Sequence, residues 1–208
     1  MAYFPMFIKI EDQPILIVGG GTTALRKAEK LSYFKPCLSF VAKEFQEETM
    51  NLILQEHCDY AQRAFCEEDL FNAKMVIAAT NDHEVNATIA RLCHERAIPI
   101  NSVDDQDNCS FFFPSLYTNQ EIVCGISSGG HSPVIAQRVR QILEAQVPEG
   151  LGAVNERLGT LRPLLKSKGT LSKRRAFYHL IIDLLLDHPE LTDEELLELY
   201  ERFKKDED

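Results

Sequence analysis

Hydrophobic runs and amphipathic segments alternate along the first hundred residues of the chain. Residues 14–18 form a short run of aliphatic side chains that predicts a buried strand. Residues 22–34 place Ala24, Ala28 and Leu31 on one helical face. The alternation continues with strands expected at 38–41, 75–79 and 98–100, and with helices at 45–56 and about 81–97. Strands separated by helices are typical of βαβ units, so this part of the chain predicts a parallel sheet.

The pattern changes after residue 110. An aromatic run at 111–113 ends at a proline, and a strand is expected at 121–126. After residue 133 only helices are expected, at 134–146, 151–165, 171–186 and 192–203. The fold class is therefore α/β, with an N-terminal Rossmann domain (parallel sheet) over 1–113, a small α/β segment over 114–150 and a helical C-terminal domain over 151–208.

Two of the expected helices begin at residues suited to capping. Asn81 with Glu84 resembles a capping box, so we expect the helix to start there. Ser132 followed by Pro133 is a favourable N-cap and first-turn pair.

A glycine-rich turn separates the first strand from the first helix. Gly19, Gly21 and Ala24 fit the pattern Gly-x-Gly-x-x-Ala, the dinucleotide fingerprint with its permitted final alanine. The glycines let the backbone approach a pyrophosphate, and the helix N-terminus offers free N–H groups to that anion. Thr22 and Thr23 could add hydroxyl donors. The alternative is a tight turn that binds nothing.

The end of the second strand leaves the choice of dinucleotide open. About 20 residues after the glycines, an acidic residue usually holds the adenosine ribose. Lys43 stands at that place and Glu44 follows one residue later. Lys43 would suit the 2′-phosphate of NADP, and Glu44 would suit the 2′-hydroxyl of NAD. Both residues could equally be the solvated start of the next helix.

Two adjacent carboxylates, Asp104 and Asp105, follow the strand expected at 98–100. Ligands of doubly wound sheets bind beyond the carboxyl ends of the strands. A carboxylate there could act as a general base. An Asx-type turn explains the same pair of residues equally well.

Composition and charge limit the classes of partner that the chain is expected to bind. Of its 208 residues 45% are hydrophobic and 26% are charged, the balance of a globular protein. It has 22 basic and 32 acidic side chains, a net charge of −10, which argues against nucleic acid or a membrane surface as the main partner. The N-terminus lacks a signal-peptide pattern, so we expect a cytoplasmic protein. The six cysteines form no C-x-x-C pair, so we expect reduced thiols and no bound metal.

Several motifs resemble those of the precorrin-2 dehydrogenase / sirohydrochlorin ferrochelatase family, which includes the N-terminal half of siroheme synthase. They fall in family order over about residues 1–152, whereas the C-terminal helices match only in kind. The motifs are FPMF at 4–7, IVGGG at 17–21, Ala24, Arg26-Lys27, AATND at 78–82, NSVDD at 101–105, FFFPS at 111–115, ISSGGHSP at 126–133 and PEGLG at 148–152.

The resemblance implies NAD-dependent oxidation of precorrin-2 to sirohydrochlorin in siroheme biosynthesis, a branch of porphyrin biosynthesis. In some members a ferrochelatase (lyase) step follows, with Fe²⁺ as a substrate rather than a bound cofactor. The resemblance also implies a homodimer built on the segment after residue 113, which makes 114–150 the dimerisation segment. It assigns the proton chemistry of both steps to Asp104, and we count Thr80 of the AATND motif among the cofactor-binding residues.

The implied substrate is a tetrapyrrole with many carboxylates, although the chain itself is acidic. The loop at 127–130 leads into the helix that Ser132 caps, so backbone N–H groups face whatever lies there. We therefore expect Ser128, Gly129, His131 and Arg138 to contact the substrate. An exposed loop histidine and a surface or dimer-contact arginine are the alternatives for the last two.

This chain departs from the family at two of these positions. Lys43 stands where the family usually has proline, and His131 stands where relatives often have threonine or lysine. Two other functions compete with the bifunctional enzyme. One is a Rossmann domain that senses NAD without catalysis, which would leave the clusters at 104 and 127–133 without a role. The other is an enzyme with the dehydrogenase or the chelatase activity alone.

Overall fold

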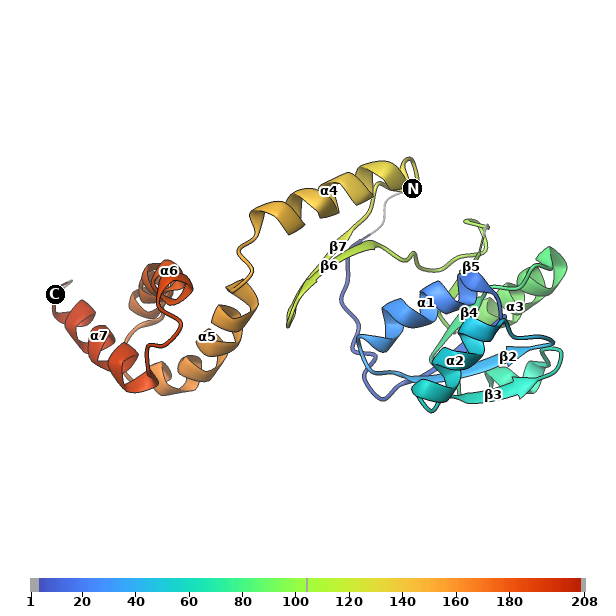
Figure 1. Cartoon of the computed structure of the whole chain (residues 1–208), viewed down its shortest axis with the longest axis horizontal. Coiled ribbons are helices and arrows are strands. Elements are labelled where there is room, and N and C mark those ends of the chain that lie inside the picture. The colour runs from blue at the N-terminus through green and yellow to red at the C-terminus, as the bar shows by residue number, and fades with distance from the viewer. Residues whose placement is uncertain (1–3, 104, 207–208) are drawn as a thin grey trace. The chain divides into compact units, whose positions relative to one another are not determined.

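The structure is a computed structural model, and it describes residues 4–103 and 105–206. The chain divides into two compact units (Figure 1). The first unit is Met6–Phe113. The second comprises Pro114–Asp208 together with the first residues of the chain.

The first unit is built on a five-stranded parallel sheet with the order β3-β2-β1-β4-β5. Its elements follow one another as β1 (Pro14–Val18), α1 (Thr22–Ser32), β2 (Cys37–Ala42), α2 (Glu47–Gln55), β3 (Asp59–Gln62), a 3₁₀ helix (Glu67–Leu70), β4 (Met75–Ala78), α3 (His83–Glu95) and β5 (Ile100–Ser102). The connecting helices pack on both faces of the sheet, α1 and α2 on one and α3 on the other. The predicted α/β Rossmann class is confirmed.

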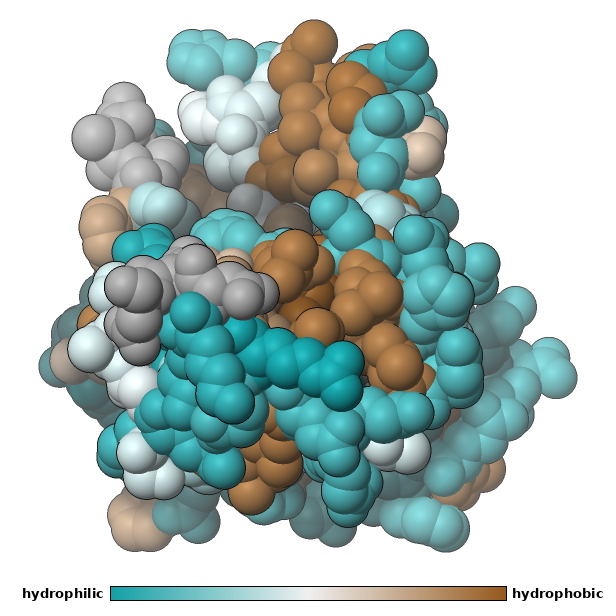
Figure 2. Space-filling view, turned by 90° about the vertical axis from the view of Figure 1, so that its left-hand side faces the viewer, coloured by the Kyte–Doolittle hydropathy of each residue, from teal (hydrophilic) through white to brown (hydrophobic). Residues whose placement is uncertain are grey.

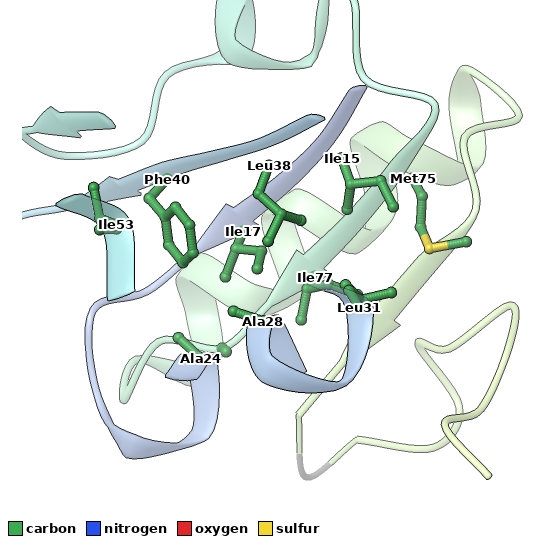
Figure 3. Close-up of a cluster of buried hydrophobic side chains, with 11 residues drawn as sticks. Ile15, Ile17, Ala24, Ala28, Leu31, Leu38, Phe40, Ile53, Met75 and Ile77 are labelled. Carbon is green, nitrogen blue, oxygen red and sulfur yellow. The ribbon is translucent and has the colours of Figure 1, made fainter. Parts of the chain in front are cut away.

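Alternate residues of the central strands point to opposite faces of this sheet, and each face has its own core. Ile15 and Ile17 of β1 pack with α1 and α2, as Figure 3 shows. Leu16 and Val18 pack with α3 on the other face. β1 and β4 are buried along their length, which explains why their sequences are continuous hydrophobic runs.

Three features of this unit differ from the sequence-based expectation. β3 was not predicted because it is a polar edge strand, paired only with β2. β5 begins at Ile100 rather than at residue 98, so Asn101 and Ser102 lie in the strand, where both are buried, rather than after it. The N-cap of α3 is Asp82 and not Asn81, because the Asp82 carboxylate accepts hydrogen bonds from the N–H groups of Glu84 and Val85.

The second unit begins with an antiparallel hairpin that the helix α4 (Pro133–Gln146) covers. The hairpin consists of β6 (Ser115–Asn119), which the sequence did not predict, and β7 (Ile122–Ile126). As predicted, Ser132 caps α4 and Pro133 starts it. The amide of Asn119 donates to the carbonyls of Pro148 and Glu149, which ties the hairpin to the turn before the next helix.

The last three helices form a small bundle with its own hydrophobic core. They are α5 (Leu151–Lys166), α6 (Leu171–Asp187) and α7 (Asp193–Asp206). Phe177 and Tyr200 lie at the centre of this core with Leu161 and Leu165. Hydrophobic side chains also reach the surface, lying between hydrophilic ones on the side of the molecule that Figure 2 shows. None of the helices in the described ranges is long and apolar enough to cross a membrane.

The capping of α3 gives a first prediction. Asp82→Ala should lower the free energy of unfolding by about 1 kcal/mol, because two N–H groups of the helix lose their acceptor. Urea unfolding of the purified variant measures the change. Asn81→Ala is the matched control and should change stability by less than about 0.5 kcal/mol, since Asn81 is an exposed neighbour outside the cap. Equal losses in the two variants would contradict the assignment of the cap.

Candidate functional site

The order of the strands creates a switch point between β1 and β4. β1 pairs with β2 on one side and with β4 on the other, so the chain leaves these neighbouring strands in opposite directions. In open α/β sheets, ligands bind at such a point, beyond the carboxyl ends of the strands. Here the glycine turn at 19–21 follows β1, and residues 79–82 follow β4.

The first two glycines of the turn are required by the protein's own packing. Gly19 has φ +137°, a conformation that favours glycine, and a Cβ there would lie 2.3 Å from the carbonyl oxygen of Ala79. A Cβ on Gly20 would lie 2.2 Å from the carbonyl oxygen of Glu44. The glycine turn is therefore packed between the ends of β4 and β2. The role of Gly20 depends on a residue distant in sequence, so the fingerprint alone did not indicate it.

Gly21 differs from its neighbours because the space beside it is open. It is the N-cap of α1 with an extended backbone, φ −96° and ψ −176°. Within the described part of the chain, only the Gln46 side chain comes as near as 4.0 Å to the position of a Cβ. Glycine has no side chain to cap the helix, so the first N–H groups of α1 remain for another acceptor. An open space in front of free helix N–H groups fits a bound pyrophosphate.

The other predicted cofactor residues of β1 and β2 gather at the same edge of the sheet. Thr22 donates a hydrogen bond to the Gln46 side chain at 3.0 Å, and Thr23 is exposed in the first turn of α1. Lys43 and Glu44 are exposed directly after β2. Gln46 was not predicted as part of the site. Its place beside Gly21 depends on the N-terminus of α2 folding back toward the glycine turn, where the Gln46 N–H donates to the Gly20 carbonyl.

Thr80 lies at the same edge, but its hydroxyl is used inside the protein. It donates to the side-chain oxygen of Asn86 at 2.7 Å and accepts from the N–H of Asp82 at 3.1 Å. The Asn86 amide also donates to the Thr80 carbonyl at 3.0 Å. Thr80 thereby fixes the turn after β4, and its N–H lies beside Gly19.

The structure describes one of the two carboxylates that follow β5 in sequence. Asp104, the predicted base, lies outside the described residues. Asp105 forms an Asx-type turn: its Oδ1 accepts from the N–H groups of Asp107 and Asn108 at 3.1 and 3.2 Å. Its Oδ2 accepts from the Asn108 amide at 2.6 Å. The turn alternative therefore holds for Asp105.

The predicted substrate contacts lie in the second unit, on the loop before α4 and on α4 itself. The Ser128 hydroxyl accepts from the N–H of Ser132 at 3.1 Å, and the Ser128 carbonyl accepts from the N–H of His131. Gly129 has φ +66°, which lets the loop turn toward the helix. His131 and Arg138 are exposed. The structure thus brings Ser128, Gly129 and His131 together at the N-terminus of α4, with Arg138 farther along the helix.

Among the described residues, no group of three or more His, Cys, Asp or Glu side chains is placed to hold a metal ion. All six cysteines are free thiols.

The different surroundings of Gly20 and Gly21 give a second prediction. Gly20→Ala should lower the free energy of unfolding by about 2–3 kcal/mol, because its Cβ overlaps the backbone of Glu44 and Phe45. Gly21→Ala is the matched control and should cost about 1 kcal/mol at most, the difference between glycine and alanine as an N-cap. Thermal and urea unfolding measure both values. A larger loss in Gly21→Ala than in Gly20→Ala would contradict this description of the turn.

Comparison with known proteins finds similarity to an NAD(P)-binding family and to siroheme synthases. The family model described as "Putative NAD(P)-binding" matches residues 6–115. The siroheme synthase of Pseudoalteromonas translucida is 35% identical over 184 residues, 88% of this chain and 39% of that protein. The siroheme synthase of Zymomonas mobilis is 36% identical over 189 residues, 90% of this chain and 40% of that protein. The chain therefore spans about two fifths of the length of these relatives.

A solved structure shares the fold of almost the entire chain. It is described as SirC, precorrin-2 dehydrogenase, and it matches with a TM-score of 0.74 at 21% sequence identity. The match covers 96% of this chain and 100% of that one. This structure shows the shared fold, and the similarity to siroheme synthases confirms the resemblance expected from the motifs.

Proposed function

Because the chain belongs to the Putative NAD(P)-binding family, we propose that it is an NAD-dependent oxidoreductase that converts precorrin-2 to sirohydrochlorin in siroheme biosynthesis. The observation that carries the proposal is the open, uncapped N-terminus of α1 at Gly21, at the switch point of the sheet. The siroheme synthases that match most of this chain support the choice of substrate.

Different residues at this edge of the sheet contact different parts of the cofactor. The N–H groups of α1 face the pyrophosphate, with Gly19 and Gly21 allowing its close approach and Thr23 adding a hydroxyl donor. Thr22 adds a second donor when its hydroxyl turns from the Gln46 side chain to the cofactor. Lys43 and Glu44, after β2, lie where the adenosine ribose is usually held. Thr80 shapes the turn after β4, which lies on the other side of the switch point from the end of β2. When bound, NAD accepts a hydride from a ring carbon of the substrate.

The oxidation also releases a proton. Removal of a hydride and a proton converts precorrin-2 and NAD⁺ into sirohydrochlorin, NADH and H⁺. Asp104 is the proposed base, because in sequence it lies two residues beyond the end of β5 and a carboxylate can accept that proton. Ser128, Gly129, His131 and Arg138 are the proposed contacts for the carboxylates of the tetrapyrrole, which an anion-binding helix N-terminus and a guanidinium suit.

We propose that the active protein is a cytoplasmic homodimer, joined through residues 114–150. An exposed apolar stripe on α4 supports this proposal: Ile135, Val139 and Ile142 lie at i, i+4 and i+7 and are all exposed in the single chain. Sedimentation of the purified protein measures the assembly directly.

One experiment distinguishes the proposed activity from its alternatives. Purified protein is incubated with precorrin-2 and NAD⁺, and NADH formation is followed by absorbance before Fe²⁺ is added. NADH formation supports the dehydrogenase. After iron is added, the rate at which sirohydrochlorin is consumed is compared with and without protein. A faster rate with protein shows a second, ferrochelatase activity of the same chain. NAD⁺ binding without any turnover would contradict the proposal and favour a sensor.

A further inference from the structure

The side chain of Gln46 joins the N-terminus of α2 to the N-terminus of α1. Gln46 is the N-cap of α2, but its side chain makes no capping hydrogen bond to its own helix. Its Oε1 accepts from the Thr22 hydroxyl at 3.0 Å, and its main-chain N–H donates to the Gly20 carbonyl at 2.9 Å. Two hydrogen bonds therefore hold Gln46 against the glycine turn, far from it in sequence.

The bond from Thr22 also orients the amide group of Gln46. With Oε1 accepting from Thr22, the amide nitrogen Nε2 lies on the side of Gly21, 4.0 Å from the position that a Cβ on this glycine would take. Within the described part of the chain, Nε2 has no hydrogen-bond acceptor. An amide nitrogen carries two N–H donors, so both face the open space in front of α1.

The loop that carries Gln46 is anchored on both sides, although the Gln46 side chain is exposed. The ring of Phe45 packs edge-to-face against Tyr60 of β3, with 5.8 Å between the ring centroids, and against the core on the α1 side of the sheet. The Gln62 amide donates to the Lys43 carbonyl at 3.5 Å. The position of Gln46 is therefore set before a ligand arrives, which lowers the entropic cost of a contact with it.

Gln46 is the uncharged member of an acidic stretch. Glu44, Glu47 and Glu48 surround it in sequence, and all three are exposed. A carboxylate at position 46 would present only acceptors and a negative charge to an anion, whereas the amide presents donors without a charge. The residue type at this position therefore suits an anionic ligand beside Gly21.

We propose that Gln46 is a cofactor-binding residue: its amide nitrogen donates a hydrogen bond to the pyrophosphate of the dinucleotide and adds to the N–H groups of α1. This inference rests on the proposed function, because it concerns the cofactor of the proposed reaction. Gln46 contributes to the affinity for the cofactor and takes no part in the transfer of the hydride or the proton.

The test compares Gln46→Glu and Gln46→Ala with the unmodified protein by calorimetric titration with NAD⁺. Gln46→Glu keeps an oxygen that accepts from Thr22 and the main-chain bond to Gly20, so the melting temperature should be retained. Its affinity for NAD⁺ should fall by about 100-fold, because a donor is replaced by a charge of the same sign as the ligand. Gln46→Ala should lose about 10-fold, the effect of removing one hydrogen bond to a charged group.

Glu47→Gln is the control for the general effect of charge. It changes the charge by one unit at the neighbouring exposed position and leaves the Gln46 amide in place, so the affinity for NAD⁺ should change by less than about threefold. If Gln46→Glu and Gln46→Ala changed the affinity no more than this control, Gln46 would be only a structural link between the two helices and the inference would be wrong.

Titration with ADP identifies the part of the cofactor that Gln46 contacts. ADP carries two linked phosphates without the nicotinamide, so Gln46→Ala should weaken the binding of ADP and of NAD⁺ by a similar factor. A loss for NAD⁺ alone would overturn the assignment to the pyrophosphate.

These titrations need no tetrapyrrole, which separates the inference from the proposed function. NAD⁺ affinity that depends on Gln46, in a protein that does not oxidise precorrin-2, would overturn the proposed function and leave the role of Gln46 intact. NAD⁺ affinity that is independent of Gln46, in a protein that is fully active, would overturn the role of Gln46 alone.

Discussion

Asp104→Asn is expected to abolish precorrin-2 oxidation while the protein still binds NAD. Asparagine has nearly the same shape as aspartate but cannot accept a proton at neutral pH, so only the proton-transfer step is lost. General-base catalysis typically contributes about 100- to 10,000-fold, and a fall in kcat of this size is expected. NADH formation measures the activity, and fluorescence titration with NADH measures cofactor binding.

The neighbouring aspartate provides the matched control. In Asp105→Asn the side chain keeps the oxygen that accepts from Asp107 and Asn108, and it loses mainly the contact with the Asn108 amide. This variant should therefore retain most of its activity, because the Asx-type turn survives. Turnover retained in Asp104→Asn would exclude Asp104 as the base. A much larger loss in Asp105→Asn than in Asp104→Asn would reverse the two roles.

The buried strands could be predicted from sequence because a strand that is covered on both faces is a continuous run of hydrophobic residues. β1 and β4 lie in the middle of the sheet, so every side chain of β4 and every side chain of β1 after Pro14 enters one core or the other. β3 and β6 gave no such signal. β3 is at the edge of the sheet and exposes Asp59, Tyr60 and Gln62, and in β6 only Tyr117 is buried. Their strand character comes from pairing with a neighbour, which is a tertiary effect.

The observed ends of α3 and β5 differ by one or two residues from the predicted ends, and these small differences change which residues lie in the candidate site. Asn81 and Asp82 are both good N-caps, and the sequence does not distinguish them. At β5, Pro99 lacks an N–H group and contributes only its carbonyl, which accepts from Val76, so regular pairing begins at Ile100. This shift buries Asn101 and Ser102 in the strand and leaves the turn after it to begin at Val103.

In the candidate cofactor site, some features depend on residues adjacent in sequence and others on contacts between residues far apart in sequence. The glycine spacing and the strand before it predict a dinucleotide site at this turn, because that geometry is set within a few residues. The need for glycine at position 20 comes from the carbonyl of Glu44, 24 residues away. A single sequence carries no record of such contacts between distant residues.

Gly21→Asp is expected to prevent NAD binding without unfolding the protein. Gly21 is the N-cap of α1 with an extended backbone, and aspartate is one of the best N-cap residues. The new carboxylate would accept hydrogen bonds from the first N–H groups of the helix, so the melting temperature should stay the same or rise slightly. Those N–H groups are the ones proposed to bind the pyrophosphate, which would then face a negative charge without donors.

The expected loss of NAD affinity is at least about 10-fold and reaches about 100-fold where two hydrogen bonds are lost, because hydrogen bonds to a charged group contribute about 1.5–3 kcal/mol each. Calorimetric titration with NAD⁺ measures it. Gly21→Asn is the control: it caps the helix in the same way but carries no charge, so its affinity should lie between those of aspartate and glycine. Unchanged affinity in Gly21→Asp, with the protein folded, would show that the dinucleotide binds elsewhere and would remove the glycine turn from the site.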